Sequence, residues 1–254
     1  MAPPHLIAHR GWALRYPENT RAALAAALEA GARWVETDVQ LASDGVPYLF
    51  HDRTLERLCG VQGALHRLTS GAVDALRASE PKSFGQRFRA LPVARLEVVP
   101  ELLALHAKAF CFVELKRVTL EHHGIERVLD AVLPVVEPLA GRCALISFSL
   151  PVLTAARRRT RLPVGAVIED WRLLGDPELH ALAPEYVFAD LECLPSSGPL
   201  RVPHGRLAVY EVARPELALE LGARGASFVE TFAIGEMLAA FAQLGLRGEE
   251  PRPA

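Results

Sequence analysis

The chain has 254 residues, of which 50% are hydrophobic and 23% charged, and its formal net charge is −2 at pH 7. This balance is typical of a compact globular protein and excludes a disordered or collagen-like chain. It provides no basic field for nucleic acid or an anionic membrane, and no apolar run approaches the ~20 residues that span a bilayer. The first residues, "MAPPHLIAHRG", lack the pattern of a secretory signal, so we expect a cytoplasmic protein with no nucleic-acid partner and no stable membrane insertion.

Short apolar runs alternate with amphipathic helical patterns along the whole chain. The runs that predict strands are 5–9, 33–39, 110–115, 143–148, 163–168, 185–189, 206–212 and 226–231. Helices are predicted over 18–31, 95–108 and 120–139, and from residues 149, 176, 213 and 234 onward. Eight strands that alternate with helices predict an α/β fold, a parallel (β/α)8 TIM barrel, rather than an open sheet.

One further apolar run, 46–52, does not fit this alternation. It follows the second strand after only "LASDG", whereas a parallel crossover needs a dozen or more residues. We therefore predict an antiparallel hairpin closed at Asp44-Gly45, which brings His51 to the barrel rim. The segment 53–94 is rich in glycine and proline and is interpreted as a small insertion beside the active-site face. We predict a single domain over 1–254, with a frayed tail at 247–254.

Polar residues crowd the stretch "LIAHRGWALRYPENT", residues 6–20. His9 and Arg10 end the first predicted strand, at the rim where TIM barrels place their chemistry. Pro17 marks the entry to the first helix, and Asn19 or Thr20 can cap its free amides. We interpret the stretch as a catalytic strand end followed by a helix start, and expect only the first part to contribute to the chemistry.

Acidic residues follow the alternation of the second and third barrel strands. Glu36 and Asp38 lie two apart, as do Glu114 and Lys116, so each pair shares one face of its strand. Buried carboxylates are costly unless they are paired or bind a cation. The three carboxylates Glu36, Asp38 and Glu114 outnumber the two nearby cations, Arg10 and Lys116. The pattern predicts a divalent cation, Mg²⁺ or Ca²⁺, on these three carboxylates. A salt-bridged network that caps the barrel is the alternative.

Two histidines complete the predicted site. His9 and His51 meet at the rim in this arrangement and can act as general base and general acid near neutral pH. Arg10 and Lys116, together with a divalent cation, form a receptor for an anion such as phosphate. These residues predict metal-assisted hydrolysis of a phosphate ester.

Five blocks of sequence resemble the glycerophosphodiester phosphodiesterase family: "AHRG" at 8–11, "PENT" at 17–20, "VETDVQLASDGVPYLFHDRTLERLCG" at 35–60, "LEVVPELL" at 96–103 and "VELK" at 113–116. The resemblance implies a TIM-type barrel and an enzyme that hydrolyses glycerophosphodiesters to sn-glycerol 3-phosphate and an alcohol, as part of lipid and glycerol metabolism. It also implies roles for seven residues that match the family pattern. These are the acid/base pair His9 and His51, the metal ligands Glu36, Asp38 and Glu114, and the phosphate contacts Arg10 and Lys116.

The second half of the chain departs from that pattern. Tyr210-Glu211-Val212 stands where the family usually has Trp-Thr-Val, and Glu230-Thr231-Phe232 stands where a Thr-Asp pair is usual. Tyr210 keeps an aromatic wall and is predicted to bind substrate. Trp171 follows a strand end and is predicted either to bind substrate or to pack.

Two other functions stay open at this point. A lysophospholipase D would act on substrates that carry an acyl chain, and a non-catalytic barrel would bind a phosphate ligand without turning it over. The expected partner is a small-molecule glycerophosphodiester, and the sequence specifies neither its head group nor the oligomeric state.

Overall fold

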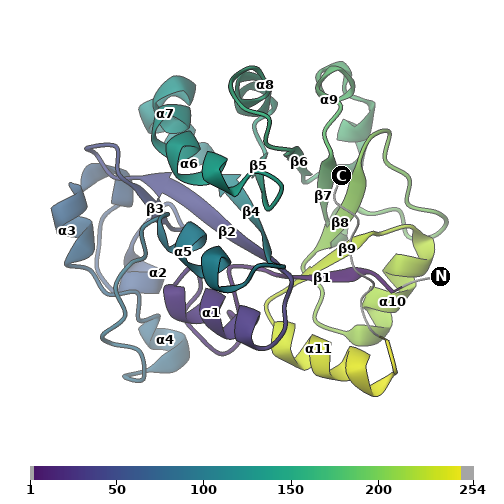
Figure 1. Cartoon of the computed structure of the whole chain (residues 1–254), viewed down its shortest axis with the longest axis horizontal. Coiled ribbons are helices and arrows are strands. Elements are labelled where there is room, and N and C mark those ends of the chain that lie inside the picture. The colour runs from purple at the N-terminus through teal and green to yellow at the C-terminus, as the bar shows by residue number, and fades with distance from the viewer. Residues whose placement is uncertain (1–2, 247–254) are drawn as a thin grey trace.

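A ring of eight strands forms the centre of the molecule, for which a computed structural model describes residues 3–246 (Figure 1). The strands are β1 (His5–Ala8), β2 (Trp34–Leu41), β4 (Phe110–Leu115), β5 (Cys143–Ser147), β6 (Val164–Ile168), β7 (Tyr186–Asp190), β8 (Arg206–Tyr210) and β9 (Phe228–Thr231). Neighbouring strands pair in parallel, and β1 pairs with both β2 and β9, which closes the ring. The predicted (β/α)8 TIM barrel is confirmed. The first and last residues of each predicted barrel strand lie within two positions of those observed.

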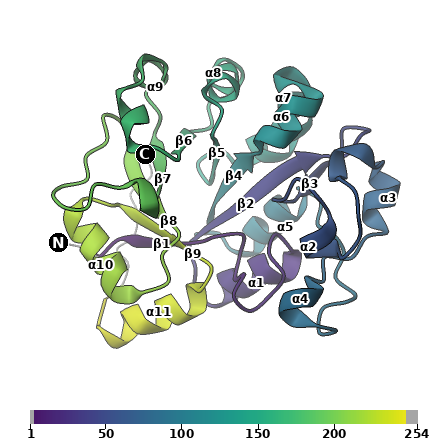
Figure 2. The same ribbon diagram turned by 180° about the vertical axis from the view of Figure 1, so that it is seen from behind.

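Helices surround this ring, as the two opposite views show (Figures 1 and 2). They are α1 (Arg21–Glu29), α5 (Val98–Leu105), α6 (Arg117–His123), α7 (Ile125–Val136), α8 (Leu150–Arg159), α9 (Pro177–Leu182), α10 (Pro215–Arg224) and α11 (Ile234–Gln243). Short 3-10 turns are η2 (Glu137–Leu139), η3 (Trp171–Gly175) and η4 (Leu191–Cys193).

The prediction of one helix over 120–139 is wrong. The helical segment begins at Arg117 and is divided at Gly124, whose positive φ of 76° ends α6 before α7 begins. Glycine adopts this left-handed conformation without the steric cost that other residues incur. Among residues 3–246, no helix combines the length and apolar character that crossing a bilayer requires.

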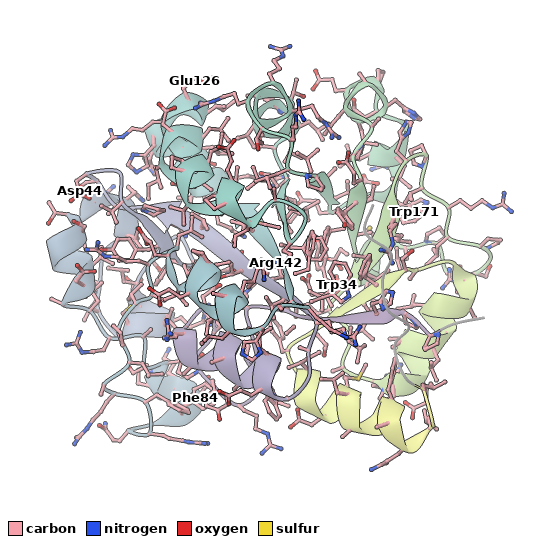
Figure 3. The ribbon with its side chains drawn as sticks, in the orientation of Figure 1. Trp34, Asp44, Phe84, Glu126, Arg142 and Trp171 are labelled. Carbon is pink, nitrogen blue, oxygen red and sulfur yellow. The ribbon has the colours of Figure 1, made fainter. Side chains whose placement is uncertain are left out.

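Alternation along the strands places aromatic rings inside the barrel, toward the amino-terminal ends of the strands. Trp34, Phe112, Tyr186 and Phe228 pack together inside the ring, with Phe112 4.9 Å from Tyr186 and 6.1 Å from Phe228 between ring centroids. Figure 3 places Trp34 near the centre of the molecule, where β1, β2 and β4 come together. The interior is therefore a packed core, and the next inward-facing positions along the strands supply the barrel mouth.

The extra strand β3 (Pro47–Leu49) lies outside the ring and pairs antiparallel with β2, so the predicted hairpin is confirmed. The segment that follows contains α2 (Glu56–Cys59), η1 (Leu65–Arg67), α3 (Ser70–Asp74) and α4 (Pro81–Phe84), at one side of the barrel in Figure 1. It has a small hydrophobic cluster of its own, in which Leu58 and Leu65 pack with Tyr48 and Phe50 of the hairpin. The single domain over 1–254 stays a prediction, and the predicted frayed tail lies outside the described residues.

Candidate active site

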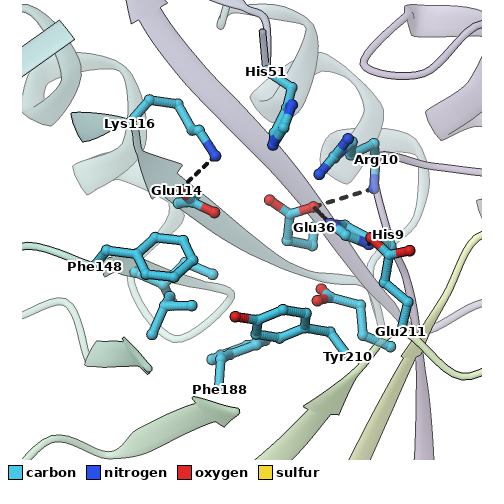
Figure 4. Close-up of a pocket in the computed structure, with 13 residues that line it drawn as sticks. His9, Arg10, Glu36, His51, Glu114, Lys116, Phe148, Phe188, Tyr210 and Glu211 are labelled. Atoms are coloured by element: carbon cyan, nitrogen blue, oxygen red, sulfur yellow. Dashed lines mark hydrogen bonds and ion pairs between the residues drawn. The ribbon is translucent and has the colours of Figure 1, made fainter. Parts of the chain in front are cut away.

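A cavity opens at the carboxyl ends of the strands. Most of the predicted site residues line it, and Asp38 lies beside them, fully buried. Figure 4 shows His51 pointing toward the centre of the cavity, with Lys116 and Glu114 on one side and Arg10 and His9 on the other. The lining residues are His9, Arg10, Glu36, His51, Glu114, Lys116, Ile146, Phe148, Val167, Phe188, Tyr210, Glu211 and Glu230.

The three predicted metal ligands converge on one point. Glu36 and Asp38 face inward from β2, and Asp38 is in register with Glu114 on the neighbouring strand β4. One carboxylate oxygen from each of the three lies within 4.8 Å of the others. Burial and the surrounding carboxylates, first of all Asp38, raise the pKa of Glu36 well above its ordinary value. The negative charge of Glu36 is therefore costly at this position unless a cation lies beside it.

Two cations partly balance these carboxylates. The Lys116 ammonium lies 2.9 Å from Glu114 and 3.1 Å from Asp38, and the Arg10 guanidinium lies 3.1 Å from Asp38. Burial favours a higher pKa for Asp38, but Lys116 and Arg10 outweigh it and hold that pKa below its usual range. Asp38 is thus ionised and doubly paired, whereas the one hydrogen bond that Glu36 accepts from residues 3–246 comes from the Arg10 backbone N–H, at 3.2 Å.

The carboxylate set fits a hard divalent cation. Oxygen Oε1 of Glu36 is buried and has no hydrogen-bond partner among residues 3–246, so its lone pairs are available to a cation. All three donors are carboxylate oxygens, which Mg²⁺ and Ca²⁺ prefer over the nitrogen and sulfur ligands typical of Zn²⁺. Glu36, Asp38 and Glu114 could hold such an ion, and Lys116 would then be shared between them and a bound anion.

His9 is enclosed at the end of β1. Its ring stacks on Phe232 at 4.6 Å between centroids, its Nε2 lies 3.7 Å from Glu36, and its Nδ1 lies 3.3 Å from Glu211. Burial and the adjacent Arg10 charge lower the pKa of His9 to about 4, against the opposing influence of Glu211. The imidazole is therefore neutral near pH 7 and able to accept a proton.

His51 reaches the cavity from the hairpin side. The amide of Gln40, buried in β2, donates to the backbone carbonyls of Phe50, His51 and Asp52 at 3.1, 3.0 and 2.7 Å. Asp52 in turn lies 2.9 Å from His51 Nδ1, which leaves Nε2 free to meet a ligand. The backbone and the ring of His51 are thus fixed by separate contacts, as a proton-transferring group requires.

The family model of glycerophosphoryl diester phosphodiesterases matches residues 9–192. The chain belongs to this family. The expected resemblance is confirmed, and curated relatives in the family are named as glycerophosphodiester phosphodiesterases, which are hydrolases.

Two bacterial phosphodiesterases illustrate the similarity. A protein of Caldanaerobacter subterraneus is 30% identical over 188 residues, covering 71% of this chain and 75% of that protein. One of Bacillus altitudinis is 35% identical over 121 residues, and the match spans about half of each chain, 48% and 49%. Among solved structures, an Oleispira antarctica phosphodiesterase in complex with the product sn-glycerol-3-phosphate has a TM-score of 0.82 at 23% identity, covering 94% of this chain and 97% of that one. It shares the fold.

Two residues of the family block "PENT" belong to the site, so the expectation that this block only starts a helix is wrong. Thr20 does cap α1, accepting from the backbone of Ala23, as predicted. Glu18, however, is buried and accepts from Arg10 at 3.2 Å, and the Asn19 amide donates to Asp38 at 2.8 Å.

The backbone explains why sequence patterns did not reveal these contacts. Arg10 and Gly11 both have positive φ, at 56° and 83°, so the chain turns sharply after β1. A Cβ at Gly11 would lie 2.5 Å from the Ala23 carbonyl carbon, so only glycine permits this approach. The turn lets the Asn19 N–H donate to the Arg10 carbonyl at 3.0 Å, which returns the block to the barrel mouth.

Asn19→Ala tests whether Asn19 supports the site through its contact with Asp38. The Asn19 side chain is buried, and it also accepts from Thr37 Oγ1 at 2.6 Å and from the Asp38 N–H at 3.1 Å. We expect the free energy of unfolding to fall by about 2 kcal/mol. The variant should also need about tenfold more Mg²⁺ for half-maximal activity, because Asp38 loses a contact that orients it. Thr20→Ala is the matched control. It should lose about 1 kcal/mol with an unchanged Mg²⁺ titration, and equal titrations for both variants would contradict the assignment.

The two predicted aromatic contacts have different positions. Tyr210 lines the cavity at the end of β8, beside Phe188, and its hydroxyl donates to the Ile168 carbonyl at 3.3 Å. Trp171 does not line this cavity; it begins η3, packs against the outer core and lies away from the barrel centre in Figure 3. The structure therefore does not bring Trp171 to the site, because η3 leads outward toward α9.

The departures from the family pattern supply two more carboxylates. Glu211 follows β8 and contacts His9, while Glu230 faces inward from β9 and is only 3% exposed. Strand alternation from Phe228 could have placed Glu230 in the barrel mouth, since the two residues lie on one face. The structure places both carboxylates in the cavity wall.

Proposed function

We propose that this family member is a divalent-cation-dependent enzyme that hydrolyses glycerophosphodiesters to sn-glycerol 3-phosphate and an alcohol. The observation that carries the proposal is the convergence of His9 and His51 with three carboxylates and two cations on one cavity. The names of the relatives and the product bound to the Oleispira antarctica phosphodiesterase support the substrate class. The cytoplasmic location stays a prediction.

The residues divide the chemistry between them. Arg10 and Lys116 bind the phosphodiester anion and neutralise charge that develops on its oxygens. A divalent cation on the three carboxylates polarises the phosphoryl oxygen when it is bound. One histidine removes the proton from the attacking hydroxyl, which belongs to water or to the substrate's own glycerol, as the new P–O bond forms, and the other protonates the alcohol oxygen as the old P–O bond breaks. Where the glycerol hydroxyl attacks, water then opens the cyclic phosphate to give glycerol 3-phosphate.

The test measures release of glycerol 3-phosphate from glycerophosphocholine and glycerophosphoethanolamine, with Mg²⁺, with Ca²⁺ and with a chelator. We expect turnover with at least one of the two metals, loss of activity with the chelator and recovery when metal is restored. Folded protein that releases no product under any of these conditions would refute the proposal. A parallel assay with lysophosphatidylcholine separates the lysophospholipase D alternative, for which faster turnover of the acylated substrate is expected.

Glu36→Gln tests the assignment of the cation site. The amide keeps the shape of the side chain but removes the charge, so we expect at least tenfold more Mg²⁺ for half-maximal activity. Glu121→Gln removes an exposed carboxylate that pairs with Arg53 on the surface and should leave the titration unchanged. A Glu36→Gln titration that matches this control would remove Glu36 from the ligand set.

A further inference from the structure

Glu230 is a buried carboxylate for which the proposed reaction has no use. It is 97% removed from solvent at the end of β9 and lines the cavity, and within the described part of the chain its Oε1 has no hydrogen-bond partner. A buried carboxylate oxygen without a partner is costly, and a cation would satisfy it. One Glu230 oxygen, one Glu36 oxygen and one His9 nitrogen lie within 4.8 Å of each other.

His9 has the surroundings of a metal-ligating histidine. Its Nε2 faces Glu36 at 3.7 Å, while the opposite nitrogen, Nδ1, lies 3.3 Å from Glu211. Histidines that bind metals commonly use one ring nitrogen as the ligand and direct the other to a carboxylate, which fixes the ring and raises its basicity. Glu211 supplies that second carboxylate from the partly exposed rim.

The charges at the barrel mouth leave room for a second ion. Five carboxylates gather there against the two cations Arg10 and Lys116, so one divalent ion does not balance them. Glu36 belongs to both ligand groups, and a carboxylate can bridge two ions through its two oxygens. Paired ions about 3.5–4 Å apart are common in enzymes that act on phosphate esters. The carboxylates are Glu36, Asp38, Glu114, Glu211 and Glu230.

We propose that His9, Glu36 and Glu230 form a second divalent-cation site, beside the oxygen-only site, that binds a transition-metal ion such as Zn²⁺. The nitrogen ligand selects this class of ion over Mg²⁺ and Ca²⁺, and three protein ligands leave a fourth position for water. An ion held there occupies the imidazole of His9 and stops it from transferring protons. This last consequence rests on the proposed function and makes the second site inhibitory.

Binding can be measured without any turnover. With the oxygen-only site saturated by Mg²⁺, we titrate the full chain with Co²⁺, a spectroscopic substitute for Zn²⁺, and follow its visible absorption. We expect one equivalent to bind with the spectrum of a nitrogen-containing site, and Zn²⁺ to displace it. Absence of a Co²⁺ complex under Mg²⁺ saturation would overturn the proposal. In the activity assay, Zn²⁺ should inhibit Mg²⁺-supported turnover at the concentrations that displace Co²⁺, and inhibition that does not follow displacement would overturn the inhibitory role.

Variants assign the ligands. Glu230→Gln should weaken Co²⁺ binding at least tenfold, and Zn²⁺ should no longer inhibit the variant's own Mg²⁺-supported turnover at the concentrations that inhibit the parent. Glu211→Gln changes a partly exposed residue and should weaken Co²⁺ binding about tenfold through His9, which keeps the test available if Glu230→Gln does not fold. Glu169→Gln, an exposed carboxylate outside this cavity, is the matched control. Equal Co²⁺ affinity in all three variants would refute the site.

The two proposals can fail separately. A chain that binds Co²⁺ under Mg²⁺ saturation but hydrolyses no glycerophosphodiester would refute the proposed function and leave the second metal site standing. A chain that turns over substrate with Mg²⁺ and binds no Co²⁺ would refute the second metal site and leave the proposed function standing.

Discussion

His51→Ala should lower kcat with Mg²⁺ by about 100-fold or more, because the group that transfers a proton at the hairpin side of the cavity is lost. The imidazole lines the cavity and is oriented by Asp52 at 2.9 Å, so the deletion leaves the carboxylate cluster and its cations in place. KM should therefore change much less than kcat. The measurement is steady-state release of glycerol 3-phosphate at saturating Mg²⁺, together with a thermal unfolding curve.

His180→Ala provides the control for this result. His180 is exposed in α9 and belongs to no ligand group described in the cavity, so its removal should leave both kcat and KM unchanged. Turnover by His51→Ala within a few-fold of the control would assign the proton transfers to other groups and leave His51 with a structural role.

Arg57→Met should destabilise the fold by about 2 kcal/mol and lower activity about tenfold, although Arg57 does not line the cavity. Its guanidinium donates to Asp52 at 2.7 and 2.9 Å and to Glu18 at 2.6 and 3.1 Å. Asp52 orients His51, and Glu18 contacts Arg10, so a single side chain on α2 supports both sides of the site. Its loss removes one of the two cations that contact buried Glu18, and a chain of this length should then unfold about 4–8 °C lower.

Arg53→Met is the comparison for this variant. Arg53 lies four residues earlier in the same segment, but it is exposed and pairs with exposed Glu121. Surface pairs of this kind contribute about 1 kcal/mol or less. Similar unfolding temperatures and rates for Arg57→Met and Arg53→Met would show that the contacts of Arg57 do not support the site.

Regular alternation accounts for the part of the site that sequence predicts well. Glu36 and Asp38 on β2, and Glu114 on β4, occupy inward positions that follow the barrel's packed aromatic residues, so their convergence follows from the period of a strand. The short "LASDG" turn likewise fixed the direction of the hairpin and so the approach of His51.

The contacts that were not predicted depend on backbone turns and on long side chains. Positive φ at Arg10 and Gly11 returns Glu18 and Asn19 to the barrel mouth, and no periodic pattern signals such a turn. Arg57 spans from α2 to Glu18, a contact between residues 39 positions apart that spacing does not reveal. Trp171 is the opposite case. Its position after a strand end predicts a place in the cavity wall, but η3 carries the residue away from the cavity.

The insertion has a hydrophobic cluster separate from the barrel core, and the two clusters support different residues of the site. Phe50, next to His51 in sequence, is buried in that cluster with Leu58, next to Arg57, whereas the carboxylates of the proposed cation site extend from barrel strands packed in the larger core. Regions with separate cores can open separately, with their own free energies of local unfolding. A fluctuation that opens the insertion would release His51 and Arg57 together while Glu36, Asp38 and Glu114 stay assembled. Such an opening would remove one of the two cavity histidines and leave His9, at the end of β1, beside the carboxylates.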